Sequence, residues 1–457
     1  MLGPEVSVVA KNDRPNVVVF FTDQQRWDTT GVHGNPLDLT PNFDRMVSFG
    51  THVYNMFTCQ PVCAPARASL QTGRYATNTG VYQNSIALRK DEKTLAHYFK
   101  GAGYRTGYIG KWHLADDEPV APDQQGGYDY WLGANVLEFT STPYETVLYD
   151  NDGQEVRLPG YRVDALTDAA IRYIDANKEH PFFLTISYIE PHHQNHIDDY
   201  VPPDGYRERY TGRWMPPDLT ALGGSAGQHL GGYFGLVKRL DEALGRILDA
   251  LKSLGLDSNT IVVYTSDHGC HFKTRNSEYK RSCHDSSIRV PTGFTGPGFI
   301  GGGRLQEMVS LVDIAPTILD AAGIPVPEQM EGRSILPLIR REKVDWPEEV
   351  FVQISESGIA RAVRTKRWKY CVEVKDAKWP FPSSSDHYTE AYLYDLESDP
   401  YELRNLIGYK SHQKVAAVMR ERLLRRMREA GEAEPEITLA EPVESGQRQV
   451  TDEEAYE

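Results

Sequence analysis

The chain has 457 residues, more than one compact core usually holds, so a large domain with a smaller companion is expected. Hydrophobic residues make up 40% of the chain and charged residues 25%, as is usual for a soluble globular enzyme. The formal net charge of −15 argues against a nucleic-acid-binding protein, which needs a basic face. A small basic pocket for an anionic substrate is still compatible with this charge.

Membrane spans and disulfides are not expected either. No stretch approaches the roughly 18 apolar residues that cross a bilayer. Residues 1–16 form too short and too polar a segment for a signal peptide. We therefore expect a cytoplasmic protein, or a periplasmic or secreted one if a leader has been removed. The cysteines are few and odd in number, which does not indicate a disulfide framework.

Buried strands alternate with helices along most of the chain. Runs of β-branched and aromatic residues predict strands buried on both faces at 16–22, 104–110, 182–189 and 260–265. Apolar periodicity predicts helices at 41–49, 93–100, 162–176 and 233–254, with Gly101 and Gly255 as C-caps of the second and the last. The alternation predicts an α/β fold with a large, mostly parallel central sheet between layers of helices.

The pattern changes after Arg340. Residues 350–374 resemble short amphipathic strands, residues 392–406 are rich in turn residues, and a basic helix is expected at 413–429. We therefore predict a large N-terminal domain over residues 1–345 and a smaller C-terminal antiparallel α+β subdomain over 346–430. Residues 431–457 are rich in Glu and Pro and are predicted to form a loosely ordered tail.

Polar residues follow each predicted strand, where open parallel sheets bind their ligands. Polar residues at a single strand end commonly belong to a solvated loop or a helix cap. Polar residues at four strand ends that meet at one edge of the sheet predict a functional site. Asp23, Gln24 and Asp267 offer oxygen ligands and His268 offers an imidazole, a set that favours Ca²⁺, with Mg²⁺ second, over Zn²⁺. The remaining strand-end residues are Lys111, His113, His192 and His193.

The segment from Cys63 to Arg74 reads CAPARASLQTGR. With Cys63, Pro65 and Arg67 at its fixed positions, it resembles the signature of formylglycine-dependent sulfatases of the alkaline-phosphatase superfamily. The alternative is a buried apolar cysteine, which the arginine, the proline and the TGR triplet disfavour. The resemblance extends from about Arg14 to Leu406 through RPNVVVFFTDQQ, GYIGKWHL, TSDHG and YLYDLESDPYELRNL.

The resemblance implies that a formylglycine-generating enzyme oxidises Cys63 to formylglycine, whose hydrate attacks sulfur and then releases sulfate by collapse to the aldehyde. The modified residue 63 would also bind the metal ion, together with Asp23, Gln24, Asp267 and His268. The family normally has a second acidic residue at the position of Gln24. An amide there keeps an oxygen ligand but removes one negative charge.

Further roles carry over to the matching residues. Arg67 would stabilise the ionised hydrate, Lys111 would contact sulfate oxygens, and His113 would take the proton during collapse. His192 would contact sulfate near the leaving oxygen, and the adjacent His193 is the weaker choice. YKRSCHDSSIRVP aligns Lys280 with a catalytic lysine, while His284 is an alternative acid for the leaving group.

The predicted function is therefore hydrolysis of a sulfate ester, with a sulfated carbohydrate or another sulfated small molecule as substrate. Aromatic residues near the predicted mouth, including Trp112, Tyr206 and Trp214, suit a sugar ring. A phosphodiester or phosphonate monoester hydrolase of the same superfamily is the alternative, although Lys111 and Lys280 stand where a second metal ion would be needed. An inactive binding homologue is a third possibility, and the oligomeric state is not predicted.

Overall fold

A ten-stranded mixed sheet forms the centre of the computed structural model, which describes residues 14–446 and 448–457. Its strand order is β10-β2-β9-β8-β1-β7-β3-β4-β5-β6. The neighbouring middle strands run parallel to one another: β8 (Thr260–Ser266), β1 (Asn16–Thr22), β7 (Phe182–Ser187), β3 (Arg105–Lys111) and β4 (Tyr130–Ala134). The predicted α/β fold with a mostly parallel central sheet is confirmed. Most of the segment considered as a signal peptide, residues 1–13, lies outside the described residues.

The outer strands were not predicted. β9 is antiparallel to both of its neighbours, and β5 is antiparallel to β4 and β6. β5, β6 and β9 are only four residues long, β10 begins with exposed residues, and β2 contains buried polar residues, so none shows the continuous apolar run of a doubly buried strand. They are β2 (Thr51–Phe57), β5 (Thr146–Tyr149), β6 (Glu155–Leu158), β9 (Thr292–Thr295) and β10 (Gly303–Ser310).

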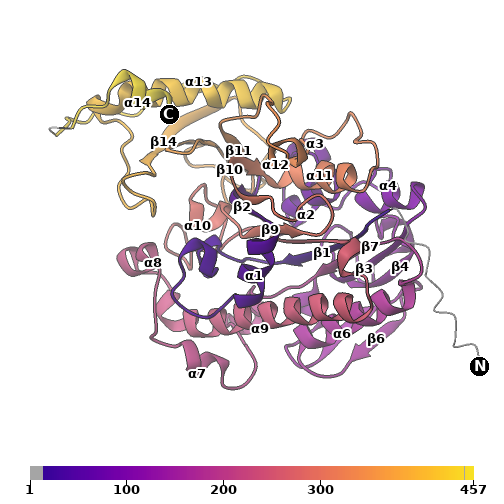
Figure 1. The fold of residues 1–457 in the computed structure, drawn as a ribbon. Coiled ribbons are helices and arrows are strands. Elements are labelled where there is room, and N and C mark those ends of the chain that lie inside the picture. The colour runs from indigo at the N-terminus through magenta and orange to yellow at the C-terminus, as the bar shows by residue number, and fades with distance from the viewer. Residues whose placement is uncertain (1–13, 447) are drawn as a thin grey trace, which may run out of the picture.

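Helices cover both faces of the sheet (Figure 1). Val18 and Phe20 of β1 join the core under α1 (Pro41–Phe49), α6 (Arg162–Asn177) and α9 (Ala226–Ser253). Val17, Val19 and Phe21 join the opposite core, under α2 (Cys63–Thr72), α4 (Leu95–Gly101) and α11 (Ile314–Ala321). Successive β1 side chains point to opposite faces, so both faces must be apolar. This explains why β1 shows no polar alternation.

Several helix boundaries differ from the prediction, most by one or two residues. α9 begins at Ala226 rather than Tyr233, although glycine is a poor helix former. A Cβ on Gly231 would lie 2.3 Å from Thr211 Oγ1, and one on Gly232 would lie 2.3 Å from the Tyr200 carbonyl oxygen. Close packing therefore requires these glycines. α4 includes Gly101 and is capped by the next residue.

A second, smaller sheet follows in the chain. β11 (Val350–Ile354), β12 (Ala360–Arg364), β13 (Trp368–Glu373) and β14 (His387–Asp395) pair in antiparallel order, as predicted. The basic helix α13 (Gln413–Glu429) packs on this sheet and lies at the yellow end of the chain in Figure 1. The domain boundary near residue 345 stays a prediction.

The described part of the predicted tail contains two short elements. β15 (Glu436–Thr438) adds to β14 in parallel, and α14 (Asp452–Tyr456) packs against α13. The Trp368 indole nitrogen donates to the Glu454 carbonyl oxygen at 2.7 Å. Main-chain pairing and this side-chain contact connect the segment to the second sheet, and its loose order stays a prediction.

The remaining short helices lie in the connections. They are α3 (Ala76–Thr79), α5 (Leu137–Thr140), α7 (Tyr206–Tyr210), α8 (Pro217–Leu222), α10 (Asp285–Ile288) and α12 (Leu336–Ile339). Within residues 14–446 and 448–457, no helix combines the length and the apolar character needed to cross a membrane.

Candidate active site

The predicted metal ligands meet where the central strands end. Asp23 follows β1, Asp267 and His268 follow β8, and Cys63 is the first residue of α2. One potential ligand atom from each of these residues lies within 4.8 Å of the others, and all four side chains are buried. Because β1 and β8 are adjacent and parallel, their carboxyl ends bring the ligands together.

Cys63 lies at the centre of this cluster. Its Sγ is 3.6 Å from Asp23 Oδ1 and 3.3 Å from His268 Nε2. Lys280 Nζ donates to the same sulfur at 2.8 Å. Arg67 lies four residues further along α2, so it projects from the same side of the helix as Cys63.

Two cationic side chains are held against the carboxylates. Arg67 Nη2 donates to Asp23 Oδ2 at 2.9 Å and to Asp267 Oδ2 at 3.4 Å. Lys111 Nζ donates to Asp23 Oδ2 and to Glu138 Oε1, both at 2.8 Å. All of these groups are buried, so their attraction is weakly screened and their positions are well defined.

The charges in the cluster shift its pKa values in opposite directions. Burial disfavours ionisation of Cys63, but the Lys111 and Lys280 ammonium groups hold the pKa of its thiol well below the ordinary value. Burial and then the nearby Asp23 carboxylate raise the pKa of Asp267 to about 7. Burial also lowers the pKa of His113, which favours its neutral form. The site therefore stabilises an anion at residue 63 beside a neutral imidazole.

The donor set fits a hard cation. Gln24 Nε2 donates to Tyr200 at 3.1 Å and to the Cys270 sulfur at 3.4 Å, which leaves Gln24 Oε1 buried without a protein partner. A buried oxygen without a partner is uncommon in folded proteins, and a metal ion would satisfy it. With the two aspartates, Gln24 makes the ligand set rich in oxygen, as Ca²⁺ and Mg²⁺ prefer.

The histidines take different positions around the cluster. The His113 side chain hydrogen-bonds to Cys63, while its Nδ1 is buried without a partner. His192 Nδ1 bonds to the His193 carbonyl oxygen at 2.7 Å, and its Nε2 lies 3.4 Å from Lys280 Nζ. The His193 ring stacks on His192, with ring centroids 4.3 Å apart, and packs at a tilt against Tyr279, with centroids 4.5 Å apart. His193 lines the catalytic cavity beside His192, and no hydrogen bond joins it to Cys63 among the described residues.

His284 is the exception among the predicted residues. Its Nε2 bonds to the Tyr394 hydroxyl at 3.1 Å, and its ring packs against Tyr392. It lines a different cavity, formed with the second sheet, because the chain turns into α10 directly after it. The geometry therefore places Lys280 at Cys63 and gives no support to His284 as the acid for the leaving group.

A cavity of about 470 Å³ leads to Cys63, His113, His192 and Lys280. The aromatic residues expected at its mouth lie elsewhere, since Trp112 is buried in the core and Trp214 packs on Phe234. Tyr206 is likewise away from the cavity, where it bonds to Glu242. Residues that the sequence did not indicate also line this cavity: Asn84, Glu138, Phe139, Tyr279 and Arg281.

Two unpredicted residues contact the cationic side chains directly. Glu138 pairs with Lys111, and Ser187 Oγ accepts a hydrogen bond from Arg67 Nη1 at 2.7 Å. Ser187 is the last residue of β7, so the strand-end rule could have found it. Glu138 follows β4, a strand that the sequence pattern did not reveal.

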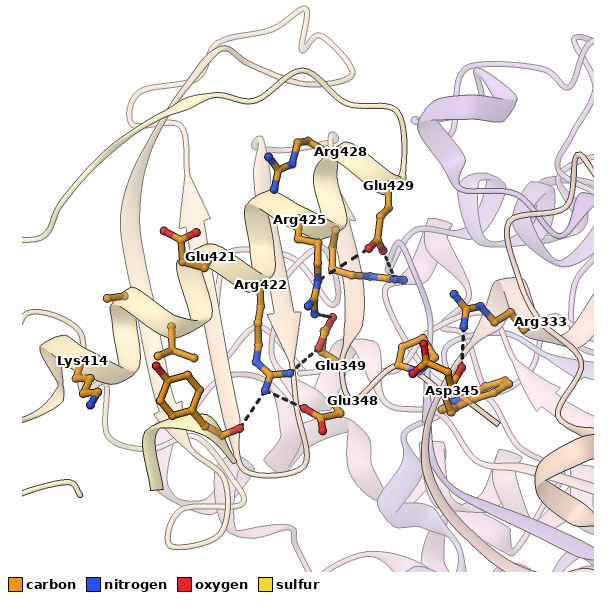
Figure 2. A pocket seen from close by; sticks show the side chains of 16 residues that line it. Arg333, Asp345, Glu348, Glu349, Lys414, Glu421, Arg422, Arg425, Arg428 and Glu429 are labelled. Atoms are coloured by element: carbon orange, nitrogen blue, oxygen red, sulfur yellow. Dashed lines mark hydrogen bonds and ion pairs between the residues drawn. The ribbon is translucent and has the colours of Figure 1, made fainter. Parts of the chain in front are cut away.

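A larger cavity of about 900 Å³ lies against α13, away from the predicted site residues (Figure 2). Most of its arginines are paired with neighbouring carboxylates, and Arg333 donates to the Asp345 carbonyl oxygen. Arg422 bonds to Glu348 and Glu349, and Arg425 donates to Glu349 at 2.6 Å. These pairs neutralise most of the charge on its wall, and the cavity contains none of the groups that surround Cys63.

Comparison with known proteins agrees with this geometry. The sulfatase family model matches residues 15–324, and the model of the N-sulphoglucosamine sulphohydrolase C-terminal region matches residues 277–429. The chain is 29% identical to the ulvan-active sulfatase of Formosa agariphila, over 94% of this chain and 84% of that protein. It is 26% identical to the N-acetylglucosamine-6-O-sulfatase of Bacteroides thetaiotaomicron, over 88% and 84% of the two chains.

The fold has solved counterparts as well. The crystal structure of yidJ from Bacteroides fragilis superposes with a TM-score of 0.81, covers 93% of this chain and 98% of its own, and is 24% identical. At that identity the likeness shows a shared fold. The family match covers more than half of the chain and includes the strands and the helix that bring Cys63, Asp23 and Asp267 together. The chain belongs to the sulfatase family and is a sulfuric ester hydrolase.

Proposed function

We propose that this sulfuric ester hydrolase removes sulfate from a sulfated carbohydrate, with formylglycine at residue 63 and Ca²⁺ held by Asp23, Gln24, Asp267 and His268. The observation that carries the proposal is the position of Cys63, which lies among buried carboxylates, Lys280 and His268. Relatives named for ulvan and for N-acetylglucosamine 6-O-sulfate favour a carbohydrate substrate.

The maturation step adds a partner to the proposal. A formylglycine-generating enzyme would oxidise Cys63 before the protein becomes active, and hydrated formylglycine would supply the nucleophile. The bound cation would supply positive charge near the sulfate oxygens. The surrounding side chains must then orient the substrate and move its protons.

The positions of the neighbouring groups suggest a division of roles. Arg67 is fixed by Asp23 and Ser187 beside residue 63, where its permanent charge stabilises an ionised nucleophile. His192 lines the cavity where sulfate oxygens would lie, and Lys111, bonded to Asp23 beside residue 63, would offset negative charge from behind the cluster. His113 hydrogen-bonds to residue 63 and is largely neutral, so it can accept a proton.

Lys280 is the proposed acid for the leaving group. Its ammonium nitrogen lies 2.8 Å from Cys63 Sγ and 3.4 Å from His192 Nε2, on the side of the cluster that faces the cavity. An ammonium group there can donate to the departing oxygen and interact with the sulfate.

The test compares three kinds of substrate with the same enzyme preparation. We expect sulfate release from 4-nitrophenyl sulfate and from members of a panel of hexose and hexosamine monosulfates. Turnover of bis(4-nitrophenyl) phosphate should be much slower. A preference for the phosphate diester would contradict sulfate ester hydrolysis, and turnover of the aryl sulfate alone would contradict the carbohydrate substrate.

A further inference from the structure

The short helix α5 (Leu137–Thr140) brings two adjacent residues of opposite character to the catalytic cavity. Phe139 lines the cavity yet is 69% exposed, although a phenylalanine ring gains free energy when it is buried. Glu138 lines the same cavity but is only 4% exposed. An exposed aromatic ring beside a polar pocket indicates a contact surface for a ligand.

Several contacts hold α5 in place. Leu137 is fully buried in the core, and Glu138 Oε1 bonds to Lys111 Nζ at 2.8 Å. Gln194 Nε2 donates to the Glu138 carbonyl oxygen at 2.8 Å, and Thr140 Oγ1 donates to the Val147 carbonyl oxygen at 3.1 Å. The backbone that carries Phe139 is thus fixed before any ligand binds, which reduces the entropy lost on binding.

Glu138 carries a second, independent sign of a ligand. One carboxylate oxygen, Oε1, bonds to Lys111, but the other, Oε2, is buried without a hydrogen-bond partner. Burying a carboxylate oxygen without a donor has a free-energy cost, so such atoms are rare in folded proteins. Because Glu138 lines the cavity, a donor on the substrate can satisfy this oxygen.

We propose that Glu138 and Phe139 form the element that recognises the sugar ring bearing the sulfate. The Phe139 ring stacks on the C–H face of that sugar, and Glu138 Oε2 accepts a hydrogen bond from a sugar hydroxyl next to the sulfated carbon. A second sulfate at that position is disfavoured, because it would place an anion against the Glu138 carboxylate. This assignment rests on the proposed function and adds a substrate requirement, a free hydroxyl beside the sulfate ester.

The role of Phe139 is tested with Phe139→Ala, Phe139→Trp and the control Phe49→Ala. Phe49 is 70% exposed on α1 and does not line the cavity. Phe49→Ala therefore removes an equally exposed ring at a position away from the cavity. Steady-state kinetics use the hexose and hexosamine monosulfates. We expect Phe139→Ala to raise KM by about tenfold with a smaller change in kcat, since the loss is one of stacking. Phe139→Trp should restore KM, and Phe49→Ala should match the wild type.

The role of Glu138 needs a test that separates it from the support of Lys111. Wild type and Glu138→Ala are compared on a sugar sulfate and on its analogue with hydrogen in place of the adjacent hydroxyl. Glu138→Met, which keeps a long side chain but offers no oxygen acceptor, serves if the alanine variant does not fold. We expect the wild type to lose at least about tenfold in kcat/KM on the deoxy analogue, and the variant to lose little. Any effect through Lys111 lowers kcat/KM equally on both substrates, so it cancels in the ratio of the two values.

The outcomes distinguish this inference from the proposed function. If the wild type releases sulfate from none of the sugars, the carbohydrate function itself fails. If the wild type turns over a sugar sulfate but Phe139→Ala keeps its KM, the stacking role is overturned. Equal losses on the deoxy analogue in wild type and Glu138→Ala overturn the hydrogen bond.

Discussion

Gln24 is the residue at which the proposed metal site departs from the paired carboxylates of the family pattern. Its Oε1 is buried without a partner, while its amide nitrogen is held by Tyr200 and Cys270. Gln24→Glu adds a negative charge at this position and should tighten Ca²⁺ binding by about tenfold, and Gln24→Ala should weaken it by a similar factor. Calorimetric titration with CaCl₂ measures both. Equal Ca²⁺ affinity in wild type and Gln24→Ala would show that Gln24 is not a ligand.

A second prediction tests whether Lys280 or His284 protonates the leaving group. A leaving group with a high pKa needs a proton, whereas 4-nitrophenolate does not. Lys280→Ala should therefore reduce kcat by about 10²-fold or more on a sugar sulfate and by much less on 4-nitrophenyl sulfate. His284→Gln keeps a hydrogen-bonding group beside Tyr394 and should change neither rate by more than about twofold. Equal losses on both substrates in Lys280→Ala would argue against proton donation by Lys280.

The sequence predicted most of the residues around Cys63, because strand ends and the signature segment are local features. It could not choose between Lys280 and His284, since their side-chain directions depend on the turn before α10. It also missed Glu138, whose contact with Lys111 joins residues 27 positions apart in the chain. Such contacts are set by the tertiary fold.

At the scale of secondary structure elements, the segment after α13 is part of the second sheet. Arg361 on β12 is fully buried, and its Nε contacts both Glu432 carboxylate oxygens, at 2.9 Å and 2.7 Å. Glu432→Ala leaves this arginine with backbone acceptors only, and we expect a loss of about 3 kcal/mol in unfolding free energy. Thermal unfolding followed by calorimetry measures the shift in Tm.

The control for this change is Glu434→Ala. Glu434 pairs with Arg428 at 3.3 Å, but both side chains are more than half exposed. Such a pair contributes roughly 0–1 kcal/mol, so Tm should barely change. Similar shifts in the two variants would mean that the Arg361 contact does not anchor the tail.

The strands that the sequence revealed and those that it missed differ in their surroundings. β1, β3, β7 and β8 are covered by helices on both faces, so nearly all of their residues are buried. β10 reads GRLQEMVS and has exposed residues at its start, a pattern that cannot be told from a loop. The early start of α9 was hidden because its glycines are selected by close packing rather than by helix propensity.

At the scale of the whole molecule, a buried ionic cluster joins the second sheet to α10. Lys369 on β13 donates to Asp285 Oδ1 at 2.5 Å and also pairs with Glu402, and all three side chains are buried. Asp285 opens α10, five residues after Lys280, so this cluster connects the second sheet to the segment that carries the proposed acid.

Lys369→Met should therefore reduce both Tm and kcat, because it leaves two carboxylates buried and loosens the Lys280 segment. Lys366→Met changes an exposed lysine next to β12 and should change neither Tm nor kcat. If kcat is unchanged in Lys369→Met, this cluster does not influence the active site.

Burial opposes ionisation of Asp285, but Arg364 and Lys369 hold its pKa below the ordinary 3.8. The stability from Asp285 is thus present above pH 3.8 and is lost as the pH falls through the lower folded value.

The central claim is that residue 63, as formylglycine, is the nucleophile of a sulfate ester hydrolase. The most direct measurement is sulfate release from 4-nitrophenyl sulfate by protein produced with a formylglycine-generating enzyme, with mass spectrometry of the residue 63 peptide in the same sample. We predict formylglycine at residue 63, sulfate release that follows its content, and no release by Cys63→Ala. Release by Cys63→Ala at the wild-type rate, or none from protein with formylglycine and Ca²⁺, would contradict the account.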